Sequence, residues 1–308
     1  MTVTPEERNQ SATPEGANQL AWERQWGPRV GIAAGLASVC VLASFAFQLP
    51  LLRDKTKDEA ETLTSVHKHA TGYVASGIFQ MLAMFLVVGV LVYLFRATKF
   101  RRPQTPSVAY YLGIAGPIIF GIAGAIGPFV IKHYATEFVN GANHSNQHAK
   151  DLVNGGSAQI FSIITPAAGL AFAFSMIMTN VNAIRVGLLS TFAGVIGVIG
   201  GVLFVIPLGP PQLLLFFYLV SVSIIFLDRW PGGRGPAWAT GKAVKWPTAM
   251  ERRGMAPGAR GGPRGRQPEP EPEPKAEREL TIGSDEEVQE AGPSRTSRKR
   301  KRKQGRKH

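Results

Sequence analysis

The stretch VGLLSTFAGVIGVIGGVLFVIPLGPPQLLLFFYLVSVSIIFL, residues 186–227, contains no Lys, Arg, Asp or Glu over 42 residues. About 20 apolar residues are enough to cross the hydrocarbon core of a bilayer, so this stretch is long enough for two crossings. Pro207, Pro210 and Pro211 interrupt it near its middle, and proline ends a helix because it lacks a backbone donor. The stretch therefore predicts a tight hairpin of two membrane-spanning helices.

Four other stretches also lack charged residues, namely 30–52, 69–95, 103–131 and 152–184. With the hairpin they predict an all-α integral membrane protein of about six transmembrane helices. We expect these helices at about 30–52, 72–95, 108–131, 158–179, 186–207 and 211–227. The remaining segments are predicted to be a polar N-terminal arm (1–29), an interfacial segment rich in Trp and Arg (228–254), and a disordered cytoplasmic tail (255–308).

The sidedness of the chain follows from the basic residues close to the span ends, which favour the cytoplasm. One side collects twelve of them: Arg8, Arg24, Arg29, Arg96, Lys99, Arg101, Arg102, Arg185, Arg229, Arg234, Lys242 and Lys245. The other side collects six: Arg53, Lys55, Lys57, Lys68, Lys132 and Lys150. We therefore predict that both termini lie in the cytoplasm.

Five of the six histidines fall in or beside the two larger loops on the opposite side: His67, His69, His133, His144 and His148. Imidazole is a common metal ligand and titrates near neutral pH, so this clustering is compatible with metal binding or pH sensing. His144 and His148 would lie one turn apart if residues 142–152 were helical. Two Asn-Gly turn signals nearby equally favour an ordinary solvated loop.

Glycines recur every third residue in two predicted spans, at Gly121, Gly124 and Gly127 and again at Gly194, Gly197 and Gly200. Small residues at this spacing let helix backbones approach closely within a membrane, so we predict a role in helix packing. The alternative is a pore or a flexible gate, which the helix-kinking residues Pro117, Pro128 and Pro166 would favour.

The predicted spans carry no Lys, Arg, Asp, Glu or deeply placed His, the residues with which membrane enzymes and ion-coupled pumps work. Their main polar residues are Gln48, Gln80, Gln159 and Thr165, all near span ends or on short polar stretches. We accordingly expect no enzyme activity and no cofactor.

The part after Leu227 divides into an anchor, a spacer and a basic end. Trp230, Trp238 and Trp246 are eight residues apart among basic residues, as is typical of a membrane interface. A Pro-Glu spacer follows. Residues 295–308 then contain nine Lys or Arg and no acid, so anionic lipid headgroups or nucleic acid are expected partners besides the bilayer itself. The basic cluster comprises Arg298, Lys299, Arg300, Lys301, Arg302 and Lys303.

The segment DRWPGGRGPAWATGKAVKWPT, residues 228–248, resembles the post-membrane segment of uncharacterised multi-pass membrane proteins of high-GC bacteria. The resemblance is strongest over about residues 228–250, and hydropathy extends it over 30–250. It implies a bacterial inner membrane setting and brings no activity or functional residues.

Three hypotheses about function follow from the sequence. The first is a non-enzymatic accessory or scaffold protein whose basic tail holds a polyanion or a protein partner. The second is a transporter or channel for a small neutral or apolar solute, with the glycines used for packing and hinge motion. The third is metal or pH sensing by the histidines of the outer loops.

Overall fold

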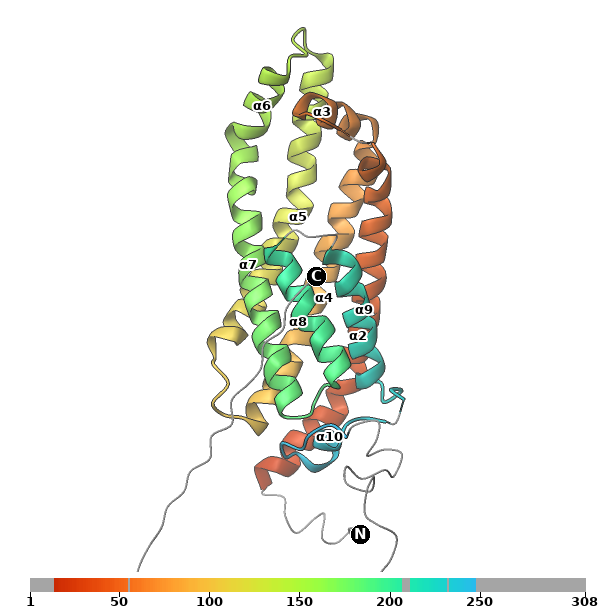
Figure 1. Cartoon of the computed structure of the whole chain (residues 1–308), viewed down its shortest axis with the longest axis vertical. Helices are drawn as coiled ribbons and strands as arrows, with labels where there is room; N and C mark the ends of the chain where they lie inside the picture. The colour runs from red at the N-terminus through yellow and green to blue at the C-terminus, as the bar shows by residue number, and fades with distance from the viewer. Residues whose placement is uncertain (1–13, 55, 207–210, 232, 248–308) are drawn as a thin grey trace, which may run out of the picture. The chain divides into compact units, whose positions relative to one another are not determined.

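The computed structural model describes residues 14–54, 56–206, 211–231 and 233–247. Its helices are shown in Figure 1. They are α2 (Pro14–Arg53), α3 (Glu59–Lys68), α4 (Ala70–Arg101), α5 (Val108–Asn140), α6 (Asn146–Asn154), α7 (Gly156–Arg185), α8 (Thr191–Val205), α9 (Pro211–Phe226) and α10 (Pro236–Thr240).

Six apolar helices pack around a ring in chain order. Helix α2 contacts α4, α4 contacts α5, and α5 contacts α7, while α7 contacts α8, α8 contacts α9, and α9 returns to α2. Helices α3 and α6 lie at one end, here called the α3 end, and α10 lies at the other, the α10 end (Figure 1). The predicted class, an all-α membrane protein, is confirmed, since four helices are long and apolar enough to cross a bilayer.

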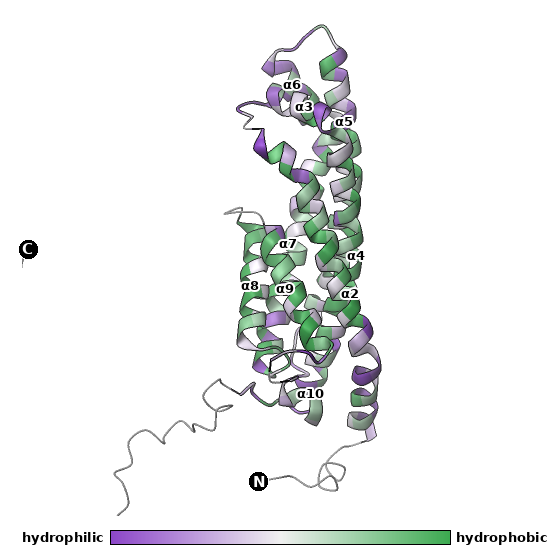
Figure 2. Ribbon diagram, turned by 90° about the vertical axis from the view of Figure 1, so that its right-hand side faces the viewer, coloured by the Kyte–Doolittle hydropathy of each residue, from purple (hydrophilic) through white to green (hydrophobic). Residues whose placement is uncertain are grey.

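The hairpin of α8 and α9 is shorter than the predicted spans. Residues 186–190 form a turn between α7 and α8. Ser190 caps the start of α8, because its side-chain oxygen accepts a hydrogen bond from the Ala193 backbone N–H. Its 15 residues extend about 22 Å, less than the hydrocarbon thickness of about 30 Å. Helices α8 and α9 accordingly lie beside the α10 half of their neighbours, and hydrophilic residues gather toward the bundle ends (Figures 1 and 2).

Helix α2 begins at Pro14, well before the predicted first span, so it includes residues 14–29 of the predicted polar arm. This extension carries Glu23, which is only 2% exposed. Both guanidinium nitrogens of Arg101, at the end of α4, bond to its carboxylate at 2.6 and 2.8 Å. A buried charge is stable only when paired in this way, so the pair fixes the start of α2 against the end of α4.

The segment after α9 packs into this end of the bundle. Arg101 also donates to the carbonyl of Ala237, and the Trp238 indole N–H donates to the carbonyl of Leu188 at 2.8 Å. Trp238 is therefore in the interior at 6% exposure, whereas the sequence predicted a membrane-surface anchor. Trp230 and Trp246 are partly buried against the same core.

The Pro-Glu spacer and the basic residues 298–303 lie outside the described residues.

Glycines set the helix spacing along the ring. A Cβ at Gly116 of α5 would lie 2.6 Å from the backbone nitrogen of Phe172 in α7. Among the predicted packing glycines, Gly194 of α8 contacts Ile184 of α7, and Gly197 contacts Asn180 of α7. A Cβ added at either glycine would clash with that side chain. Gly121 and Gly124 meet α4, and Gly200 meets Met176 more loosely. Gly127 differs, since nothing lies within 4 Å of an added Cβ.

Gly116→Ala is expected to destabilise the protein by about 1–3 kcal/mol, because the new methyl group meets rigid backbone of α7. Gly127→Ala is the matched control. It should leave stability unchanged or raise it by about 0.5–1 kcal/mol, since alanine has the higher helix propensity. Unfolding of both variants in detergent micelles measures the difference, and equal stabilities would contradict the tight α5–α7 contact.

Arg101→Met should destabilise the fold by about 3–5 kcal/mol, because the carboxylate of Glu23 then remains buried without its partner. Combining it with Glu23→Leu should recover most of the loss, since no unpaired charge is left. Unfolding in micelles compares the parent and both variants. A double variant no more stable than Arg101→Met would argue against the ion pair as the cause.

Candidate functional site

A cavity of about 350 Å³ lies within the bundle toward the α3 end. It reaches from Gln48 of α2 to Thr165 of α7, with Gln212 at the start of α9 in its wall. The shortness of the α8–α9 hairpin leaves this region to the four long helices. The other lining residues are Tyr73, Ser76, Gly77, Gln80, Phe120, Ala123, Gly124, Gly127, Pro128, Ile131, Val153, Asn154, Ala158, Phe161 and Ser162.

Two glutamines, Gln48 and Gln80, line the α2–α4 side of the cavity. The Gln48 amide nitrogen donates to the Ser76 hydroxyl at 3.4 Å, and the Ser44 hydroxyl donates to the Gln80 side-chain oxygen at 3.5 Å. Both bonds are long for their type, and an amide side chain has two donor hydrogens and an acceptor oxygen. The glutamines therefore keep hydrogen-bonding capacity for a bound molecule.

Prolines add backbone acceptors on the α5–α7 side. Pro128 lies inside α5 and Pro166 inside α7, and a helix-interior proline cannot donate to the carbonyl four residues earlier. Those carbonyls belong to Gly124 and Ser162, and both residues line the cavity. Each of these prolines thus leaves a carbonyl without its usual helical donor at a residue of the cavity wall.

Among the described residues that line this cavity, none is Asp, Glu, Lys, Arg or His. Its surface combines amides, hydroxyls and backbone oxygens with the apolar Phe120, Phe161 and Ile131. Pockets of a few hundred Å³ with a mainly apolar wall and a few polar groups bind small molecules. Because a buried ion would have no counter-charge here, the chemistry fits an uncharged solute with hydrogen-bonding groups.

Below the cavity, toward the α10 end, the bundle is closed. Met84 of α4 and Phe172 and Met176 of α7 are at most 1% exposed and belong to one continuous hydrophobic core. Phe120 lines the cavity and packs on that core through Phe204 at a ring distance of 5.6 Å. The cavity therefore ends within the bundle.

Sequence reasoning found part of this site. Of the polar residues singled out within the spans, Gln48, Gln80 and Thr165 line the cavity, and so do the predicted glycines Gly124 and Gly127. Gln212, Ser76 and Tyr73 were missed. Each is an ordinary polar residue near a helix end, and only the packing of distant helices shows that these residues share one space.

The predicted histidines are spread over the α3 end. His144 precedes α6, which begins at Asn146, so the condition of a helix over 142–152 is not met and the two histidines are not on successive turns of one helix. Both rings instead contact Phe138, at 5.5 and 6.2 Å. His67 lies 3.4 Å from the Thr136 hydroxyl, and His133 contacts Tyr134. Within the described ranges, no three His, Cys, Asp or Glu side chains are grouped to hold a metal.

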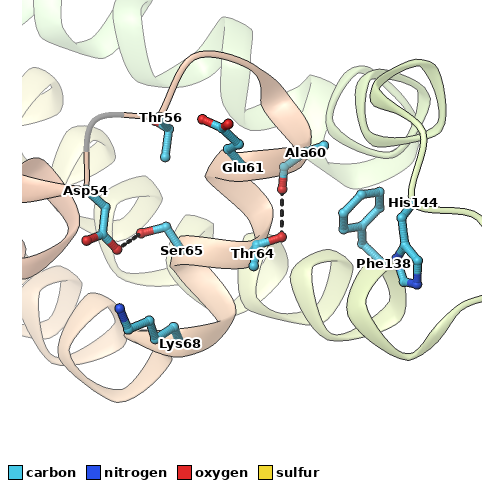
Figure 3. A pocket seen from close by; sticks show the side chains of 9 residues that line it. All are labelled: Asp54, Thr56, Ala60, Glu61, Thr64, Ser65, Lys68, Phe138 and His144. Carbon is cyan, nitrogen blue, oxygen red and sulfur yellow. Dashed lines mark hydrogen bonds between the residues drawn. The ribbon is translucent and has the colours of Figure 1, made fainter.

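A second, open pocket of about 480 Å³ at this end involves one of these histidines (Figure 3). It is lined by Asp54, Thr56, Ala60, Glu61, Thr64, Ser65, Lys68, Phe138 and His144. The Ser65 hydroxyl donates to the Asp54 carboxylate at 2.7 Å, and His69 lies 3.3 Å from the same carboxylate. The hydrogen bond from Ser65, with the nearby charges of Lys68 and His69, lowers the pKa of Asp54.

Ser65→Ala should raise the pKa of Asp54 toward its ordinary value, because the hydrogen bond that favours the ionised form is the largest cause of the lowering. Carbon-13 NMR titration of the side-chain carboxyl in micelles measures the pKa. Thr64→Ala is the control, since the Thr64 hydroxyl lines the same pocket but donates to the carbonyl of Ala60. Equal titration of Asp54 in all three proteins would contradict this geometry.

Comparison with known proteins adds a family. Residues 30–225 match the model of DUF4386, described as a domain of unknown function. The match covers the six apolar helices and leaves out the beginning of α2 and the segment with α10. No curated protein and no solved structure matches the chain.

Proposed function

We propose, for a chain that belongs to the DUF4386 family of unknown function, that it is a membrane carrier for a small uncharged solute with hydrogen-bonding groups. The cavity between α2, α4, α5 and α7 is the observation that carries this proposal. It places amide, hydroxyl and carbonyl groups within membrane-spanning helices, where polar groups are costly unless they are used.

The closed half of the bundle favours a carrier over an open channel. A channel needs a continuous path, but below Phe120 the space is filled by Met84, Phe172 and Met176. A carrier exposes its site to one side at a time, so a cavity that ends within the bundle fits one of its two states. Under the predicted sidedness, this state faces away from the cytoplasm.

The tight glycine contacts between α5 and α7 suggest how the other state is reached. Gly113 meets Ser175 and Gly116 meets Phe172, so α5 and α7 touch through backbone on the α10 side of the cavity. Close contacts without interlocking large side chains allow helices to move as rigid bodies. We place the second gate at this contact.

The other hypotheses receive less support. The scaffold role depends on residues 295–308, which lie outside the described residues, so binding of a polyanion there stays a prediction. Metal sensing would need ligands that converge, and the described histidines contact aromatic rings, a hydroxyl and the carboxylate of Asp54.

Uptake into proteoliposomes tests the carrier. Stopped-flow light scattering with glycerol, urea and erythritol should show faster entry than into protein-free liposomes for at least one of them. Gly127→Leu should abolish that increase, because Gly127 lines the cavity, its Cβ position is open, and the added side chain would take up cavity volume. Choline and acetate should not be transported, since the cavity offers no counter-charge.

Gly89→Leu is the matched control. Gly89 is an exposed α4 residue with nothing within 4 Å of an added Cβ, and it is not part of the cavity wall. This variant should transport like the parent. The carrier proposal fails if no uncharged probe enters faster than into protein-free liposomes, or if both glycine variants behave alike.

A further inference from the structure

A groove at the α10 end carries basic and aromatic residues that neither the fold nor the cavity uses. Its largest part has a volume of about 750 Å³, and an adjoining part continues it along α2. The groove joins the start of α2, the end of α4 and the start of α5. It is lined by Glu15, Asn18, Gln19, Trp22, Phe95, Arg96, Lys99, Phe100, Pro103, Ser107, Tyr110 and Tyr111.

Two cations in the groove are held in place by uncharged partners. The Arg96 guanidinium lies 5.2 Å from the centre of the Trp22 ring. The Lys99 ammonium lies 5.7 Å from the centre of the Phe95 ring and donates to the Ser107 hydroxyl at 2.5 Å. Aromatic faces and hydroxyls position a cation without neutralising it. Both charges therefore remain available to an anion.

Two other cations of this end are already used within the protein. Arg101 is paired with Glu23, and Arg234 donates to the carbonyls of Ile225 and Phe226. Neither Arg96 nor Lys99 has an ion pair with any residue that the structure describes. Glu15 is the one carboxylate in the groove wall, so the described groove carries a net positive charge.

The surroundings match a membrane interface. Tyr110 and Tyr111 line the groove with their rings 5.5 Å apart, and Tyr111 is 66% exposed. Val108 beside them is 49% exposed on the apolar α5. Aromatic rings with phenolic hydroxyls are enriched where the acyl chains meet the headgroups. Cations thus lie at the end of membrane-spanning helices, next to exposed apolar surface.

We propose that this groove binds the headgroup of an anionic phospholipid. Arg96 and Lys99 contact the phosphate, and the hydroxyls of Tyr110 and Tyr111 donate to the headgroup oxygens. The acyl chains lie along the exposed apolar face of α5. Basic pockets between helix ends at a membrane surface bind anionic headgroups by this combination of charge and apolar contact. The site is independent of the carrier cavity and of the basic C-terminal residues.

Native mass spectrometry of the full chain with phosphatidylglycerol and phosphatidylcholine tests the site. The parent should retain phosphatidylglycerol preferentially, and the double variant Arg96→Gln with Lys99→Gln should bind it about 10-fold more weakly. Arg24→Gln with Arg29→Gln is the matched control, because it removes two exposed charges from the same end but outside the groove. This control should bind like the parent.

Glu15→Gln provides a test in the opposite direction, since removing the one carboxylate should strengthen phosphatidylglycerol binding. Glycerol 3-phosphate distinguishes a lipid site from a site for a soluble phosphate and should not displace the lipid. The proposal is overturned if the groove variant binds like its matched control, if phosphatidylcholine is retained equally, or if glycerol 3-phosphate competes as well as the lipid.

Discussion

Hydrocarbon offers no hydrogen-bond partners, so every polar group among the membrane-spanning helices must find its partner in the protein or in an enclosed polar space. The structure meets this constraint differently along the bundle. At the α10 end, a charged pair, Arg101 with Glu23, is joined by two hydrogen bonds and has further partners in Gln19 and the carbonyls of Ala97 and Ala237. Toward the α3 end, glutamines and hydroxyls satisfy each other only in part and surround a cavity.

The position of the cavity depends on the length of one hairpin. Helices α8 and α9 have 15 and 16 residues, while the other four apolar helices have at least 30. The ring is therefore complete only in its α10 half, where the large buried side chains form the core. In the other half the long helices line the cavity, and among the described hairpin residues only Gln212 reaches its wall. Because α8 and α9 are shorter than the other four apolar helices, the α10 half of the bundle is tightly packed and the α3 half contains the cavity.

Glycine has two distinct roles in this arrangement. Gly116 and Gly197 allow backbones to meet, and a methyl group at either would clash with the neighbouring helix. Gly127 meets nothing and leaves room in the cavity. Gly127 and Gly197 look alike in the sequence, because the three-residue spacing shows which residues share a helix face and not what that face meets. The ion pair between Glu23 and Arg101 could not be predicted from the sequence either, since 78 residues separate the two side chains.

The sequence by itself determined the class of this protein, because the length and apolarity of its uncharged stretches reflect the thickness of a bilayer. It also indicated the interrupted hairpin, through its prolines, and some of the glycines that bring helices together, although not Gly77, Gly113 or Gly116. Tertiary structure alone decided which polar residues face one another. Gln48, Gln80, Thr165 and Gln212 lie on four different helices, and only the packing of those helices turns separate uncharged polar side chains into one site.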